Sequence, residues 1–196
     1  MAPILGIYAS QQISGHLPSP SFASIATVTA TGGETSLSFT SIPGTYKHLQ
    51  VRGIAKDTYS TSLYVEAVYI QFNSDTANNY SAHQLYSYGG AVYAAAQATT
   101  NEILGYGGIV SSGTGGTNMF GSSIVDIIDY ASTSKYKTIK AFAGGNTNVT
   151  TTTGGNAVGM FSGLWQNTAA ITKVTLLPGQ TAFAAGSTFA LYGIKG

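Results

Sequence analysis

The seven acidic residues are the first place to look for chemistry in this chain. Glycoside hydrolysis needs two carboxylates that face one another across the scissile bond. Asp126 and Asp129 are three residues apart in a predicted strand, and that spacing turns their side chains to opposite faces. We therefore expect one or the other to pair with Lys135, Lys137 or a backbone donor at a strand end. The sequence alone leaves open a catalytic pair formed by two acids that are distant in the chain.

Histidine, serine and cysteine patterns give no further catalytic or metal-binding motif. The three histidines, His16, His48 and His83, have no His or carboxylate at metal-ligand spacing, and there is no cysteine. No GxSxG elbow is present. Residues 73–79 (NSDTANN) contain one acid among amides, which is typical of Asx turns rather than of a calcium loop. We predict no catalytic residue, no cofactor, no metal site and no enzyme activity.

The chain is unusually poor in charge. Lys and Arg total 8 and Asp and Glu total 7, so 8% of the residues are charged, against about a quarter in a typical domain. Eight basic residues and a net charge of +1 suit nucleic acids and acidic membranes poorly, because these partners require clustered cations. No apolar run reaches about 18 residues, and the first residues lack a basic signal-peptide region. We expect neutral polar partners, such as sugars or other copies of the chain. We expect neither insertion into a membrane nor export by the usual signal route.

Tyrosine is the side chain best suited to such partners. Its ring offers a rigid apolar surface and its hydroxyl a hydrogen bond, so it can stack on sugars or pack between subunits. The chain has 13 tyrosines, and Trp165 is expected in the core. The residues predicted to contact glycans or subunits are Tyr59, Tyr64, Tyr86, Tyr88 and Tyr93.

Apolar residues alternate with polar ones along most of the chain, and Gly-rich or Pro-Gly breaks separate the runs. This pattern predicts about eleven antiparallel strands in a β-sandwich or barrel. Residues 91–99 (AVYAAAQAT) are compatible with a short helix, a loop or an edge strand. The predicted strands are residues 24–29, 36–41, 48–55, 63–72, 82–88, 103–110, 122–130, 138–143, 157–165, 171–177 and 188–194.

The first 21 residues differ from the rest. They hold three of the five prolines, which disfavour a helix or a central strand, yet they carry six large apolar or aromatic side chains. We predict an extended attachment arm over residues 1–21 and a β-sandwich domain over residues 22–196; a frayed terminus is the alternative for the arm. The predicted contact residues of the arm are Ile4, Leu5, Ile7, Tyr8, Ile13 and Leu17.

The end of the chain resembles a group of structural proteins of tailed-bacteriophage virions, whose domain closes with an LYGIK strand. The matching segments are residues 158–165 (VGMFSGLW), 171–177 (ITKVTLL) and 183–195 (FAAGSTFALYGIK). Earlier segments fit the same group: residues 22–28, 41–53, 70–76, 80–85, 125–131 and 135–137. The resemblance implies a jelly-roll-like antiparallel β-sandwich, often a homotrimer, and it brings no catalytic residue with it.

The function implied is that of a non-enzymatic structural protein on the virion exterior. We expect a tail or fibre component that is attached through its arm to other virion proteins and can contact glycans of the host surface. The alternatives are a cement protein that decorates the capsid and, less favoured, a glycan depolymerase. Such a protein assembles in the host cytoplasm and leaves by lysis, in agreement with the missing signal peptide.

Overall fold

A computed structural model describes residues 21–59, 65–88, 90–111, 118–148 and 156–196. Within these ranges the chain is all-β, as predicted, and no helix is long and apolar enough to cross a membrane. The strands are β1 (Phe22–Thr29), β2 (Leu37–Phe39), β3 (His48–Ala55), β4 (Val65–Phe72), β5 (Tyr80–Tyr88), β6 (Ala91–Thr100), β7 (Ile103–Ser111), β8 (Gly121–Ile128), β9 (Lys137–Asn146), β10 (Asn156–Trp165), β11 (Val174–Pro178) and β12 (Thr188–Ile194).

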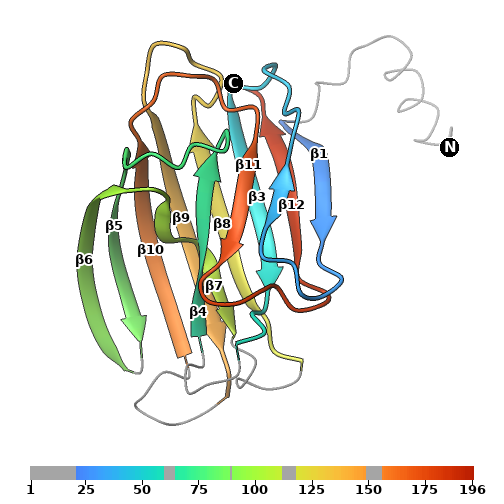
Figure 1. Cartoon of the computed structure of the whole chain (residues 1–196), viewed down its shortest axis with the longest axis vertical. Coiled ribbons are helices and arrows are strands. Elements are labelled where there is room, and N and C mark those ends of the chain that lie inside the picture. The colour runs from blue at the N-terminus through green and yellow to red at the C-terminus, as the bar shows by residue number, and fades with distance from the viewer. Residues whose placement is uncertain (1–20, 60–64, 89, 112–117, 149–155) are drawn as a thin grey trace, which may run out of the picture.

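The strands form two antiparallel sheets that pack face to face (Figure 1). The larger sheet has the order β1-β12-β3-β8-β9-β10-β5-β6, and the smaller one has the order β2-β11-β4-β7. When the hairpins β5–β6 and β9–β10 are set aside, the chain alternates between the sheets from strand to strand, except that β4 and β7 pair within the smaller sheet. That order, β1-β12-β3-β8 over β2-β11-β4-β7, is consistent with the predicted jelly roll. The two hairpins widen the larger sheet on one side.

The core lies between the sheets and is built by the period-two pattern of the strands. In β8, β9 and β10 every second residue points inward, and Val125, Ile139 and Phe161 are buried there. Gly53 of β3 makes room for the Phe189 ring, because a β-carbon at Gly53 would lie 2.2 Å from a ring carbon. Burial of these side chains is the main source of stability in such a sandwich.

The strand predictions agree with the structure apart from one strand and some ends. Each of the eleven predicted ranges overlaps an observed strand, and residues 91–99 form an edge strand rather than a helix or a loop. The prediction that the strand of residues 122–130 includes Asp129 is wrong. β8 ends at Ile128, and Asp129 has a φ of 48°, which belongs to a turn. The predicted arm, apart from Ser21, lies outside the described residues.

Candidate interaction surface

The face of the eight-stranded sheet that points away from the smaller sheet is apolar at its centre. We call it the outer face. Ile124, Phe142, Met160 and Leu85 are direct cross-strand partners in β8, β9, β10 and β5, so they form one row across the sheet. Each is between 43% and 57% exposed. We call these four residues the apolar row.

The local sequence explains why the row points outward. Val125, Ala141 and Phe161 are buried in the core, and each follows or precedes a member of the row. Adjacent strand residues point to opposite faces, so the core residues force their neighbours to the outer face. An antiparallel sheet usually has polar residues on its solvated face. The apolar row breaks that rule across four strands that are neighbours in the sheet, β8, β9, β10 and β5.

A groove runs beside the apolar row. Its volume is about 1240 Å³, and its lining includes Ile54, Ser122, Gly144 and Val158. These residues belong to the next cross-strand row, in which Ser122 pairs with Gly144 and Gly144 with Val158. Gly144 has no side chain, so the surface dips between its neighbours. The outer face therefore offers both a ridge and a hollow to a partner.

A polar row borders the other side of the apolar row. Gln50 donates from Nε2 to Oδ1 of Asp126 at 2.7 Å, and Asp126 lies opposite Lys140. Nε of Arg52 donates to Oε1 of Gln50 at 2.6 Å. The guanidinium also lies 5.3 Å from the Tyr192 ring centroid. These groups hold one another in place, and they give the outer face charges of both signs.

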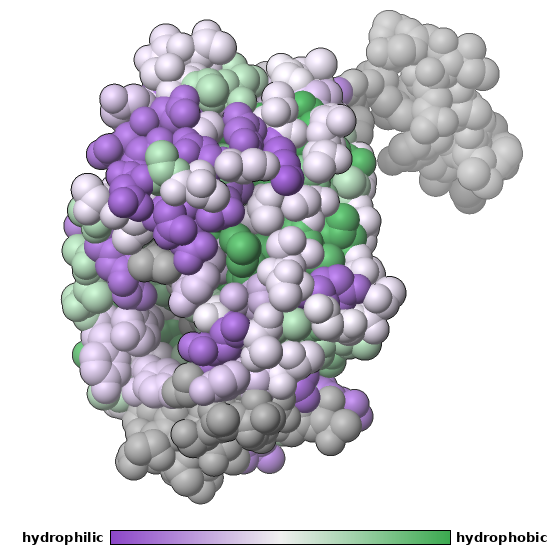
Figure 2. Space-filling view, viewed as in Figure 1, coloured by the Kyte–Doolittle hydropathy of each residue, from purple (hydrophilic) through white to green (hydrophobic). Residues whose placement is uncertain are grey.

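The four-stranded sheet has a different outward surface. Ser38, Thr175 and Gln71 are cross-strand partners in β2, β11 and β4. The Ser38 and Thr175 hydroxyls lie 3.0 Å apart, and Nε2 of Gln71 donates to the Asn101 carbonyl at 3.1 Å. Figure 2 shows this side of the molecule, with hydrophilic residues gathered over its upper part. This cross-strand row of the smaller sheet is therefore polar, with Thr175 itself buried, whereas the apolar row lies on the outer face of the larger sheet.

The structure brings together three of the five predicted tyrosines. Tyr86 and Tyr93 are cross-strand partners in β5 and β6, and their rings stack with centroids 5.3 Å apart. Tyr88, two residues from Tyr86, is half-buried, and burial, followed by the nearby Glu66, raises its pKa. Tyr93 is 44% exposed. The three rings lie on the opposite face from Leu85, where Tyr86 and Tyr88 pack against the core and support the β5–β6 hairpin.

The other two predicted tyrosines do not join this group. Tyr59 follows β3, which three strands separate from β5 in the sheet order, and its N–H donates to Oδ1 of Asp57 at 2.6 Å. Tyr64 lies outside the described residues, as do Ile4, Leu5, Ile7, Tyr8, Ile13 and Leu17. Contact of the tyrosines with glycans or subunits stays a prediction.

Sequence reasoning missed a buried carboxylate pair. Glu66 is 7% exposed and Asp57 is fully buried. Burial, and then the charge of Asp57, raise the pKa of Glu66 to about 7, while a hydrogen bond with Gln180 acts against the rise. Asp57 accepts from the N–H of Thr181 at 3.3 Å. The two acids are only nine residues apart, but Asp57 follows β3 and Glu66 lies in β4 of the other sheet, so no local motif revealed the pair. Their burial closes them to a polymeric substrate.

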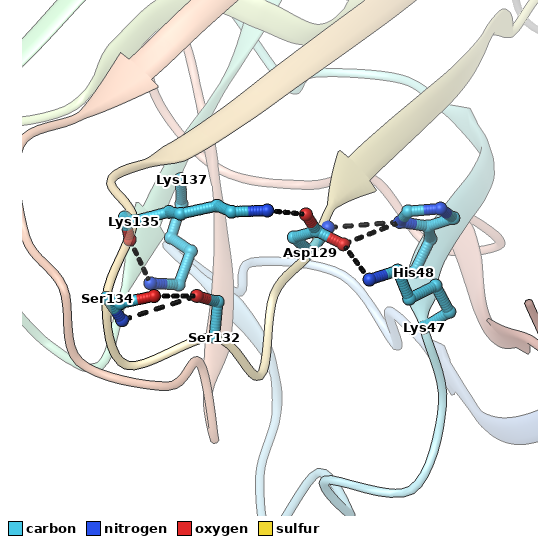
Figure 3. A network of polar contacts seen from close by, with 7 residues as sticks. All are labelled: Lys47, His48, Asp129, Ser132, Ser134, Lys135 and Lys137. Atoms are coloured by element: carbon cyan, nitrogen blue, oxygen red, sulfur yellow. Dashed lines mark hydrogen bonds and ion pairs between the residues drawn. The ribbon is translucent and has the colours of Figure 1, made fainter.

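Asp129 is the centre of a polar network at the end of β8 (Figure 3). Its two carboxylate oxygens each lie 2.8 Å from a lysine Nζ, one from Lys47 and one from Lys135. Its N–H donates to Nδ1 of His48 at 3.0 Å. Hydrogen bonds from the two lysines lower the pKa of Asp129 to about 2. The predicted pairing with Lys135 is confirmed, and the network ties the β8–β9 turn to the start of β3.

Lys137 does not pair with an acid, although the sequence suggested that it could. Its side chain is fully buried, and Nζ donates to the carbonyls of Lys135 at 2.7 Å and of Thr168 at 3.1 Å. Burial lowers its pKa. Asp126 pairs instead with Gln50 on the outer face. These contacts are explained by the fold itself and require no ligand.

Among the described residues, no group of three or more His, Asp or Glu side chains is arranged to hold a metal ion. The outer face is therefore the surface on which we base the functional argument. Comparison of the chain with family models, with curated proteins and with solved structures finds no match.

Proposed function

We propose that this protein is a non-enzymatic structural subunit on the exterior of a bacteriophage virion, most simply a tail or fibre component. The observation that carries the proposal is the apolar row on the outer face, which contrasts with the polar row on the other sheet. Exposed apolar surface of this kind marks a contact between proteins. We infer the virion as the site of this contact from the resemblance of the chain to structural proteins of phage virions.

The energetics favour coverage of the outer face. Full burial of a large apolar side chain stabilises by about 1.5–3 kcal/mol, so burying four half-exposed ones would contribute roughly 3–6 kcal/mol. The face carries Asp126 as well as Arg52 and Lys140, and the net charge of the chain is only +1. Two copies would not repel one another. We therefore take a neighbouring copy of the chain as the occupant, as in the expected homotrimer.

The arm completes the proposal. Residues 1–21 attach the subunit to other virion proteins, and the sandwich stands away from the particle, where its tyrosines can touch host glycans. This architecture needs neither a cofactor nor a catalytic residue. Assembly in the host cytoplasm and release by lysis follow from the virion role.

Purified phage particles that encode this chain test the proposal directly. Quantitative mass spectrometry of the particles should detect the protein, and immunogold labelling should place it on the outside of the tail. A copy number of tens or fewer indicates a tail part, whereas hundreds of copies on the head would replace the tail assignment with the cement role. Absence of the protein from particles would overturn the proposal.

Removal of residues 1–21 tests the arm separately. We expect the truncated protein to fold, with the melting transition of the full chain, and to be absent from particles. Normal incorporation of a folded truncation would overturn the attachment role of the arm while leaving the virion assignment intact.

A further inference from the structure

The free edge of β6 is a second surface that calls for a partner. β6 is the last strand of the larger sheet and, within the described part of the chain, pairs only with β5. It is ten residues long, and all but the last residue are exposed. Its sequence, AVYAAAQATT, contains no charge and no proline. Half of its backbone N–H and C=O groups therefore point away from β5. The strand has no charged residue or proline that would discourage pairing with a further strand.

The other sheet edges carry the features by which proteins protect exposed strands. β1 has a bulge between Ser24 and Ala26, and β2 is only three residues long. β7 lies against β8 and β9 of the opposite sheet, and its pairing with β4 is irregular between Val68 and Ile70. Bulges, short edges and covered edges all prevent strand addition. Among the described residues, β6 alone has a long edge that is regular up to its last residues.

We propose that β6 pairs antiparallel with β6 of a second copy of this chain across a twofold axis. A twofold axis perpendicular to the sheet makes the contact reciprocal: where a residue of one copy lies opposite a second residue in the other copy, the reverse pair also forms, so the contact closes on itself. Overlap of residues 92–98, which precede the left-handed Thr99 (φ 57°), places Ala95 opposite Ala95 on the axis. The two eight-stranded sheets would then continue into one another.

This register is free of steric and charge conflict. Tyr93 lies opposite Gln97, Val92 opposite Ala98, and the centre is made of alanines. Each large side chain thus meets a small or polar one, and no like charges lie opposite one another. The hairpin also leaves room on both sides of the strand, because β6 is exposed on both faces and forms the margin of the molecule in Figure 1.

The pairing also extends the outer face. Ala94 lies opposite Leu85, so β6 continues the apolar row toward its free edge. With Ala94 opposite Ala96 of the second copy, the outer faces of the two copies become one surface. The contact itself does not require a virion, so it can be tested on the isolated protein.

The mass of the assembly in solution is the first test. Light scattering on the purified full chain should give an even multiple of the 20.2 kDa chain mass, which is two copies for the β6 contact alone and six where the same contact joins two of the proposed trimers. In the Ala94→Lys, Ala96→Lys double variant, lysines face lysines across the axis, and the mass should fall by half. The matched control is Ser24→Lys with Thr27→Lys at the opposite sheet edge, which should keep the wild-type mass. A monomer, an odd multiple, or a mass that only the control changes would overturn the pairing.

Single cysteines give a second measurement that does not depend on disrupting the strand. The chain has no cysteine of its own. Ala95→Cys should form a covalent dimer with a short thiol cross-linker, because residue 95 meets itself on the axis. Val92→Cys should not, because three residues on each side of the axis separate the two thiols by roughly 20 Å. Equal cross-linking of both variants, or of neither, would overturn the register, and cross-links between Ala95→Cys and Ser24→Cys copies would overturn the twofold arrangement.

Discussion

Nε1 of Trp165 donates a 2.8 Å hydrogen bond to Oδ2 of Asp75, although the two residues are 90 positions apart in the chain. Trp165 ends β10 in the larger sheet, and Asp75 lies in the turn after β4 of the smaller sheet. The Trp165 ring also packs against Phe72 and Tyr80, with centroids 5.6 and 6.2 Å away. The bond therefore joins the two sheets at one end of the sandwich.

We predict that Asp75→Asn destabilises the fold by about 1.5–3 kcal/mol at neutral pH, the range for hydrogen bonds to a charged group. Burial raises the pKa of Asp75, but hydrogen bonds from Asn79, Ala77 and Trp165 outweigh it and lower the pKa below 3.8. The stabilisation is thus present above pH 3.8 and is lost as the pH falls through the folded-state pKa. Urea unfolding from pH 3 to 7 should show the gap between wild type and variant shrinking toward low pH.

Thr76→Ala provides the control for that variant. Thr76 is exposed in the same turn, and its replacement should change the free energy of unfolding by less than about 0.5 kcal/mol. An Asp75→Asn protein as stable as wild type at pH 7 would show that the Trp165 bond contributes nothing to the fold.

Stability should also fall as the pH rises, because of Glu66. Its pKa is about 7 in the folded protein against an ordinary value of 4.5, so folding favours the protonated acid. The contribution is fully present below pH 4.5 and is lost as the pH rises through about 7. The difference corresponds to roughly 3 kcal/mol, at about 1.4 kcal/mol for each pKa unit.

Glu66→Gln is the variant that isolates this effect. It keeps a polar side chain of the same shape and cannot ionise. We expect it to match wild type in unfolding free energy near pH 4.5 and to exceed it at pH 8. Parallel pH profiles for the two proteins would show that Glu66 ionises normally in the folded state.

The close approach of Gly53 to Phe189 predicts a large effect from a single methyl group. Gly53→Ala would place a β-carbon 2.2 Å from the ring, so the ring or the strand has to move. Overpacking of this kind costs about 1–3 kcal/mol. Gly44→Ala, where no atom lies within 4 Å of the added carbon, is the matched control. Thermal melting should separate the two variants, and equal melting temperatures would contradict the packing.

The outer face gives a prediction about association. Phe142→Lys with Met160→Lys places two charges in the apolar row, and Gln71→Lys places one on the polar face of the other sheet. If a neighbouring copy covers the outer face, only the first protein should lose subunits in light scattering while its melting temperature is retained. An unchanged assembly mass in the double variant would contradict the proposed contact.

The sequence by itself determined the secondary structure and the class of fold. Period-two alternation in β3 and β12 predicts both strands with their exact bounds, because one face must be apolar to form the core. It did not determine the end of β8: the alternation breaks at Ile128 and Asp129, yet the predicted strand continues to residue 130. The turn there is decided by Lys47 and Lys135, of which one is distant in sequence.

The candidate surfaces were decided by the tertiary structure alone. Ile124, Phe142, Met160 and Leu85 come from strands whose order in the sheet no local pattern encodes, and they form a row only because β8, β9, β10 and β5 become neighbours. Residues 91–99 were ambiguous for the same reason: alanine-rich segments suit several conformations, and pairing with β5 selects the strand. Side-chain alternation is local and can be read along the chain, whereas sheet order depends on contacts between distant segments.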